Sequence, residues 1–207
     1  MARVVSNDRD MSIPVGPDAV VQRITPSNAS LMAAMHGRFY ELARIGNLFA
    51  VSNAAATATS IALTATCTGL IISNPAGNNK DIVLEAFGFG TLLAYVALAS
   101  IGIQGGYSTA GVVTHTTPLV VTTNFRCLNL GSAYLPTALT DSAATTVNPT
   151  LLMILGGTAL AAGVSLGQFA MVDLGGGIRI QPGGWAATYT STATSSISSF
   201  WWSEETR

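Results

Sequence analysis

The sequence predicts an all-β protein, an antiparallel sandwich or barrel that follows an extended arm and one amphipathic helix. Beyond Gly46, short runs rich in Val, Ile, Leu, Thr and aromatic residues alternate with clusters of turn residues, which is the pattern of β-strands. Helical periodicity is confined to the segment before this glycine. The 207 residues suffice for one sizeable core, so we expect a single β-domain over residues 47–207.

Residues 1–24 are predicted to form an extended arm. They contain Pro14, Pro17 and charges of both signs, and no hydrophobic period runs through them, as in a linker. Charged residues such as Arg3 and Asp8 stand where a secretory signal would be apolar, so export by that route is not expected.

A helix is predicted over residues 25–46. Thr25 can cap it and Pro26 suits the first helical position, while Arg44 and then Gly46 favour an end at that point. Apolar residues recur at helical spacing, and they are Leu31, Met35, Phe39 and Leu42. Because a single helix is marginally stable alone, we expect this face to bind a partner or to cover an open end of its own sandwich.

Ten strands are predicted after the helix, a number that indicates a sandwich or a barrel. They cover residues 48–52, 70–73, 82–89, 112–116, 119–123, 151–155, 168–174, 177–180, 185–190 and 196–202. The turn-rich segment 74–79 between the second and third strands predicts a hairpin.

The last strands carry the clearest local signals. Pro182 and Gly183 suit the two central positions of a type II turn, so a strand is expected to turn back there. Trp201 and Trp202 are neighbours in the final strand, and their side chains must therefore point to opposite faces. One is expected in the core and the other at an interface with a partner.

Charged residues make up 9% of the chain, against roughly 25% in an average soluble protein. Much of the surface must therefore be neutral, and we expect a homo-oligomer to bury part of it. The net charge is −1, and the nine Lys and Arg residues are scattered along the chain. Nucleic-acid binding is therefore not expected.

Two long segments without charge raise the question of a membrane. They lie between Glu85 and Arg126 and between Asp141 and Asp173, and each is long enough for a spanning helix. Gly, Thr and Ser interrupt their apolar runs, and flanking Lys and Arg residues are missing. Buried strands are favoured, and a membrane partner is not expected.

No catalytic site, metal site or cofactor is predicted. Residues 163–167, GVSLG, have the spacing of a hydrolase nucleophile elbow, but His36 and His115 both precede the serine instead of following it. Neither histidine has a Cys, Asp or Glu at the spacing of a metal site. Cys67 and Cys127 are expected to be small buried apolar residues without a disulfide.

Several turn and strand motifs carry a resemblance to a known group. A G-x-x-F strand is followed by an N-P-x-G-x-x-K turn, and a Pro-Gly turn precedes an aromatic last strand; the segments are RIGNLFAVS (44–52), GLIISNPAGNNKDIVL (69–84), QPGGW (181–185) and FWWSEE (200–205). With these segments the chain resembles structural proteins of tailed bacteriophages. The resemblance implies a jelly-roll sandwich, similar to trimeric decoration, cement or fibre-associated modules, and it brings no catalytic residues.

The function expected from these observations is that of a non-enzymatic virion structural protein, assembled in the host cytoplasm. It would form a homo-oligomer, a trimer by the resemblance, and attach to other virion proteins such as the major capsid protein. The residues expected to bind partners are Leu31, Met35, Phe39, Leu42, Trp201 and Trp202. The alternative is a carbohydrate- or receptor-binding module, because jelly rolls also serve lectins.

Overall fold

The fold is taken from a computed structural model of the 207-residue chain. It describes residues 23–24, 30–31, 39–53, 57–59, 63–91, 99–108, 113–119, 125–131, 133–158, 169–192 and 194–207. The chain divides into two compact units, Met1–Tyr40 and Glu41–Arg207. In the first unit, β1 (Arg23–Ile24) pairs with β2 (Ser30–Leu31) in an antiparallel ladder.

The helix predicted over 25–46 is confirmed only near its end. Residues 30–31 form β2, and the helix that is present, α1 (Tyr40–Arg44), has five residues. Gly37 falls inside the predicted helix, and a glycine there weakens a helix by about 1 kcal/mol. The predicted end is confirmed, because the Gly46 N–H bonds Ala43 O and the Asn47 N–H bonds Leu42 O, the Schellman arrangement, with Gly46 at φ 75°.

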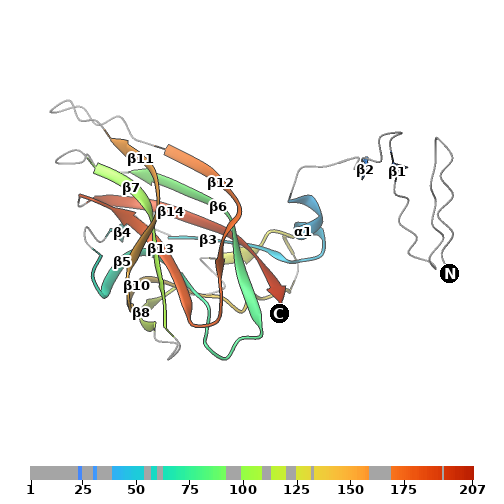
Figure 1. Ribbon diagram of the computed structural model, residues 1–207, viewed down its shortest axis with the longest axis horizontal. Coiled ribbons are helices and arrows are strands. Elements are labelled where there is room, and N and C mark those ends of the chain that lie inside the picture. The colour runs from blue at the N-terminus through green and yellow to red at the C-terminus, as the bar shows by residue number, and fades with distance from the viewer. Residues whose placement is uncertain are drawn as a thin grey trace. The chain divides into compact units, whose positions relative to one another are not determined.

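The second unit consists mainly of two antiparallel sheets that face one another (Figure 1). The first sheet has the order β11 (Thr150–Thr158), β7 (Ala99–Tyr107), β13 (Gly184–Thr190), β5 (Thr66–Ser73), β10 (Leu139–Thr145) and β8 (Thr114–Pro118). The second sheet has the order β12 (Phe169–Ile180), β6 (Lys80–Thr91), β14 (Ser195–Thr206), β3 (Leu48–Ser52) and β9 (Phe125–Cys127), and β4 (Thr57–Ala58) pairs with β14. The predicted all-β sandwich is confirmed.

Eight of these strands have the connectivity of a jelly roll. Numbered one to eight in chain order, β3, β5, β6, β7, β11, β12, β13 and β14 give the order 1-8-3-6 in one sheet and 2-7-4-5 in the other. All but one of the connections between them cross from one sheet to the other. Of the four remaining strands, β4 pairs with β14, and β8, β9 and β10 are inserted between β7 and β11 and lengthen both sheets at one edge.

The main core lies between the sheets and is rich in aromatic residues. Phe87 packs against Phe200 with ring centroids 5.0 Å apart, and Phe49 packs against Trp202 at 5.8 Å. Aliphatic side chains from the first sheet complete it, among them Leu70, Ile72, Ile101 and Ile103. A second, smaller cluster lies on the other face of the first sheet; its buried members are Cys67, Ile71, Ala144, Trp185 and Ala187.

Most predicted strands are confirmed, and at least one of the two boundaries of each lies within two residues of the prediction. The expected strands 168–174 and 177–180 form one strand, β12, and 112–116 is displaced to β8. The prediction missed β7 and β10, and all of 119–123 except Leu119 lies outside the described residues. The predicted hairpin at 74–79 is wrong, because this turn connects β5 to β6 in the opposite sheet.

Candidate functional site

The outer face of the second sheet surrounds Trp201 with small, neutral residues. Trp201 lies opposite Ala50 on β3 and Ala86 on β6, and Ser199 lies opposite Gly88. Strand pleating places these side chains on the face away from the core. We call this surface the Trp201 face, and it comprises Ala50, Ala86, Gly88, Met171, Ile197, Ser199 and Trp201. Two members are exposed apolar residues, since Met171 is 67% and Ile197 is 37% exposed.

The predicted opposition of the two tryptophans is confirmed. Trp202 is completely buried and belongs to the main core, while Trp201 is partly exposed on the outer face. Trp202 therefore cannot bind a partner, and its place among the expected partner-binding residues is corrected. The physical reason is the two-residue period of a strand, which sends consecutive side chains to opposite faces.

The second candidate surface is the outer edge of the first sheet. β11 stands at the end of the strand order and pairs, among the described strands, with β7 alone. Leu152, Met153 and Ile154 follow one another on it and are 47%, 37% and 52% exposed, and the nine residues of β11 carry no charge. Natural edge strands are usually protected by charges or by coverage. We call residues 152–154 the β11 edge.

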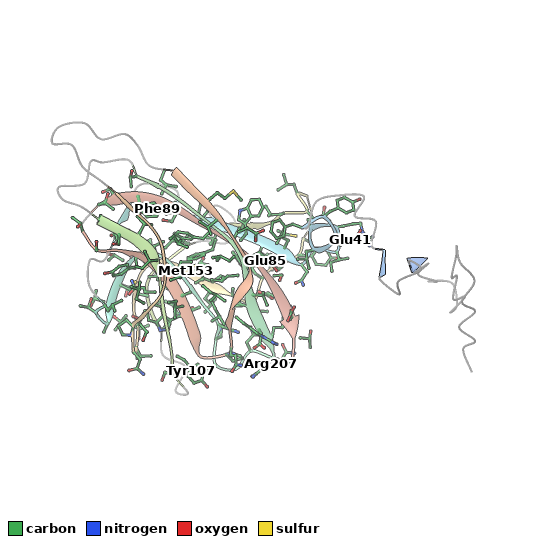
Figure 2. The ribbon with its side chains drawn as sticks, turned by 45° about the horizontal axis from the view of Figure 1, so that its top comes forward. Glu41, Glu85, Phe89, Tyr107, Met153 and Arg207 are labelled. Atoms are coloured by element: carbon green, nitrogen blue, oxygen red, sulfur yellow. The ribbon has the colours of Figure 1, made fainter. Side chains whose placement is uncertain are left out.

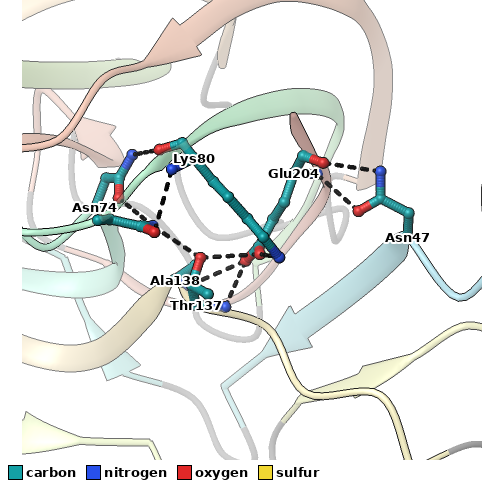
Figure 3. A network of polar contacts seen from close by, with 7 residues as sticks. Asn47, Asn74, Lys80, Thr137, Ala138 and Glu204 are labelled. Atoms are coloured by element: carbon teal, nitrogen blue, oxygen red, sulfur yellow. Dashed lines mark hydrogen bonds and ion pairs between the residues drawn. The ribbon is translucent and has the colours of Figure 1, made fainter. Parts of the chain in front are cut away.

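A buried carboxylate ties together the end of the second sheet (Figure 3). The Glu204 side chain is fully buried; its Oε1 accepts hydrogen bonds from the N–H groups of Thr137 and Ala138, and its Oε2 from Thr137 Oγ1 and Lys80 Nζ. The backbone of Glu204 also exchanges two hydrogen bonds with the Asn47 side chain. Thr137 and Ala138 belong to the loop before β10, and Asn47 directly precedes β3. The network therefore holds both segments against the end of β14.

Two turn motifs singled out in the sequence lie side by side. Asn74 exchanges backbone hydrogen bonds with Gly183 and Gly184, and its side chain donates to the carbonyl groups of Lys80 and Ile180. The predicted type II turn is present, since Gly183 has φ 90° and the Gly184 N–H bonds Gln181 O at 2.8 Å. The turns of both sheets are thus joined at one end of the sandwich.

At this same end a cleft of about 660 Å³ opens between the sheets. Its walls come from the ends of β7 and β12 and the starts of β11 and β13, and its lining residues include Tyr107, Asn148, Thr150, Leu152, Gln181 and Trp185. Figure 2 shows Tyr107 at the end of the sandwich where Arg207 also lies, with Phe89 at the opposite end. The sequence gave no signal for this cleft, because its residues come from four separate segments.

Strand pairing brings a histidine and a carboxylate together on the first sheet. His115 Nδ1 on β8 lies 2.6 Å from Asp141 Oδ2 on β10, and the Asp141 side chain is fully buried. Burial raises the pKa of Asp141, and the hydrogen bond and charge of His115 act in the opposite direction. Sequence spacing could not reveal this pair, since 26 residues separate its members.

The register also places a thiol two strands away from this pair. His115 lies opposite Ala144, and Ala144 lies opposite Cys67 on the next strand. Two strand spacings, about 10 Å, therefore separate the backbone of His115 from that of Cys67. Cys67 is completely buried, as predicted, and accepts a hydrogen bond from the Gln104 amide.

The remaining predicted residues are only partly placed. Met35, His36 and the GVSLG segment 163–167 lie outside the described residues, and Leu31 belongs to β2. Phe39 and Leu42 are both partly buried. Within the described part of the chain, no group of His, Cys, Asp and Glu side chains could hold a metal ion, and no helix there is long and apolar enough to cross a membrane.

Comparisons of the chain with protein-family models, with curated proteins and with solved structures found no match. Function must therefore be inferred from the residues themselves and from the surfaces that the fold presents.

Proposed function

We propose that this protein is a non-enzymatic structural protein that forms a closed homo-oligomer in a virus particle. The observation that carries the proposal is the β11 edge, where three consecutive apolar side chains are exposed on a strand that pairs, among the described residues, on one side only. An edge of this kind favours association with another chain. The low charge of the chain, 9% of residues, supports burial of neutral surface in an assembly.

The same subunit carries two neutral surfaces with exposed apolar side chains. The Trp201 face combines the small residues Gly88, Ala86 and Ser199 with the exposed Met171 and Ile197. The β11 edge presents exposed Leu, Met and Ile side chains. Contact between the edge of one subunit and the face of the next is heterologous, and such contacts close into a ring when the rotation between subunits allows it. The trimeric number comes from the resemblance to phage modules.

Attachment to the particle is assigned to the N-terminal region. Residues Met1–Tyr40 form a compact unit of their own, and such a unit can engage another virion protein, such as the major capsid protein, without disturbing the sandwich. The extended character of residues 1–24 in the sequence supports the same role. Assembly would take place in the host cytoplasm, and the assembled protein would reside in the virion.

The oligomeric state tests the central part of this proposal. Light scattering on the purified full chain at micromolar concentration is expected to report a stable closed oligomer, and a stable monomer would refute self-association. The virion role is tested separately by mass spectrometry of purified particles, where the protein is expected at a fixed ratio to the major capsid protein. Its absence from particles would refute that role.

A further inference from the structure

The cleft at the end of the sandwich is lined by both polar and apolar residues. Trp185, which is 2% exposed, and Ile180 supply apolar lining, while Tyr107 and Gln181 stand exposed at the rim. A volume of about 660 Å³ lies within the range of small-molecule sites, roughly 300 to 1,000 Å³. The cleft is therefore large enough for a ligand of one or two rings.

Glycine lets β7 approach the loop before β11 closely beside the cleft. A Cβ at Gly106 would lie 2.5 Å from the Val147 carbonyl oxygen and 2.6 Å from that of Asn148. Trp185 Nε1 donates to the same Val147 oxygen at 3.0 Å, which fixes the indole ring in the cluster on the other face of the first sheet. Asn148 is held at φ 49°, and its amide approaches the Tyr107 carbonyl oxygen at 3.5 Å. The wall is thus a fixed arrangement of backbone and aromatic groups.

Several hydrogen-bonding groups at the cleft have no partner within the described chain. They are the Tyr107 hydroxyl, the Gln181 amide and the Asn148 side-chain oxygen. The Tyr107 hydroxyl and the Gln181 amide can donate and accept hydrogen bonds, whereas the Asn148 oxygen only accepts them. The Tyr107 ring, 51% exposed, adds an apolar surface beside them. A ligand that fits this combination presents hydroxyl groups along its edge and a C–H face for the ring.

The charge at the cleft is balanced. Arg179 is the charged residue in its lining, and its guanidinium already binds Asp81 at 2.6 Å and approaches Glu205 at 3.9 Å. Arg207 also binds Asp81, at 3.3 Å, so two cations face two anions. A charged ligand would find no uncompensated partner, which favours a neutral one.

From this geometry we infer that the cleft binds a neutral saccharide of one or two residues, with Tyr107 as the stacking platform and Gln181 and Asn148 as hydroxyl-binding groups. A saccharide has the required pattern, because its ring carries a C–H face and a rim of hydroxyl groups. The cleft shares Leu152 with the β11 edge proposed for self-association, so the test variants are placed at Tyr107 and Gln181, which lie outside both association surfaces.

A glycan array that contains neutral, sialylated and sulfated saccharides, followed by calorimetric titration of the best neutral hit, tests the inference on the full chain. Saturable binding to neutral glycans is expected. Tyr107→Ala and Gln181→Ala are each expected to raise Kd about tenfold or more, through loss of ring stacking and of hydrogen bonds respectively. Tyr134→Ala is the matched control, because Tyr134 is 58% exposed and lies outside the cleft, and its Kd should equal that of the wild type.

Three results would overturn the inference: no saturable neutral hit, binding confined to sialylated or sulfated glycans, or an equal Kd in wild type and both cleft variants. Saturable binding to a peptide array that is lost in Tyr107→Ala would also overturn it. Light scattering on each variant separates this outcome from the proposed assembly, since the cleft variants should keep the oligomeric state of the wild type.

Discussion

The two faces of the second sheet use the same strands for different purposes. Between the sheets, Trp202 packs with Phe49 and is completely buried. On the opposite face its neighbour Trp201 stands partly exposed among alanine, glycine and serine residues. The comparison teaches that one strand, β14, can hold the core together and also offer a surface for another molecule. Residue type alone does not separate the two roles, whereas the pleat of the strand does.

The largest expected effect comes from removing the inward tryptophan. Trp202→Ala should lower the free energy of unfolding by about 3 to 5 kcal/mol, because it leaves a cavity between the sheets. Trp201→Ala should lower it by about 1 kcal/mol or less and should mainly weaken self-association. Urea unfolding at low protein concentration measures the first effect and light scattering the second. Equal losses of stability in both variants would break the comparison.

A smaller loss is expected for the buried carboxylate at the end of the same strand. Glu204→Gln keeps the shape of the side chain but removes its charge, and it should lower the free energy of unfolding by about 2 to 3 kcal/mol through weaker hydrogen bonds to Thr137, Ala138 and Lys80. The neighbouring Glu205, 57% exposed, provides the control, and Glu205→Gln should change stability by less than about 0.5 kcal/mol. Urea unfolding would contradict the expectation if both variants behaved alike.

The β11 edge should respond in assembly and not in folding. Ile154→Lys places a charge in the proposed interface, so the dissociation constant of the oligomer is expected to rise about tenfold or more. The free energy of unfolding is expected to change by about 0.5 kcal/mol or less. Ile45 is 52% exposed, as is Ile154, and Ile45→Lys is therefore a matched control outside the edge. Sedimentation over a range of concentrations distinguishes them, and identical behaviour would exclude the edge as the interface.

The smallest effect is expected from the buried Asp141 on the first sheet, and it depends on pH. Because the folded-state pKa of Asp141 is raised by burial, the folded protein retains this proton at pH values where the unfolded chain has lost it. Stability from this group is therefore present at low pH and declines as pH rises through the folded pKa. Asp141→Asn should remove that decline, which urea midpoints measured from pH 4 to pH 7 would reveal. Parallel pH profiles for both proteins would rule out this linkage.

The predictability of the fold followed the strength of the local patterns. β3 and β13 are rich in apolar residues and have turn residues beside them, and their predicted boundaries lie within one residue of the observed ones. β7 was missed because Gly102, Gly105 and Gly106 dilute its apolar pattern. Those glycines are explained by close packing, since a Cβ at Gly105 would lie 2.7 Å from the Trp185 carbonyl oxygen. Such contacts arise between segments that are distant in the sequence.

The candidate sites show the same limit. The opposition of Trp201 and Trp202 follows from strand geometry alone, but deciding which one is buried required the position of the second sheet. The exposed apolar side chains of β11 resemble those of a core strand, and their exposure depends on the place of β11 at the end of the sheet. The cleft residues and the His115–Asp141 pair come from segments that only the jelly-roll connectivity brings together.

The position of β14 in the second sheet also constrains how the chain can fold during synthesis. β14 follows every other strand in the chain, yet it lies between β6 and β3 and pairs with both. Until β14 has left the ribosome, β6 and β3 lack their shared neighbour, and their pairing edges are open to other chains. Such long-range closure is slow and exposes nascent chains to aggregation. The second sheet can therefore close only after β14 has been translated.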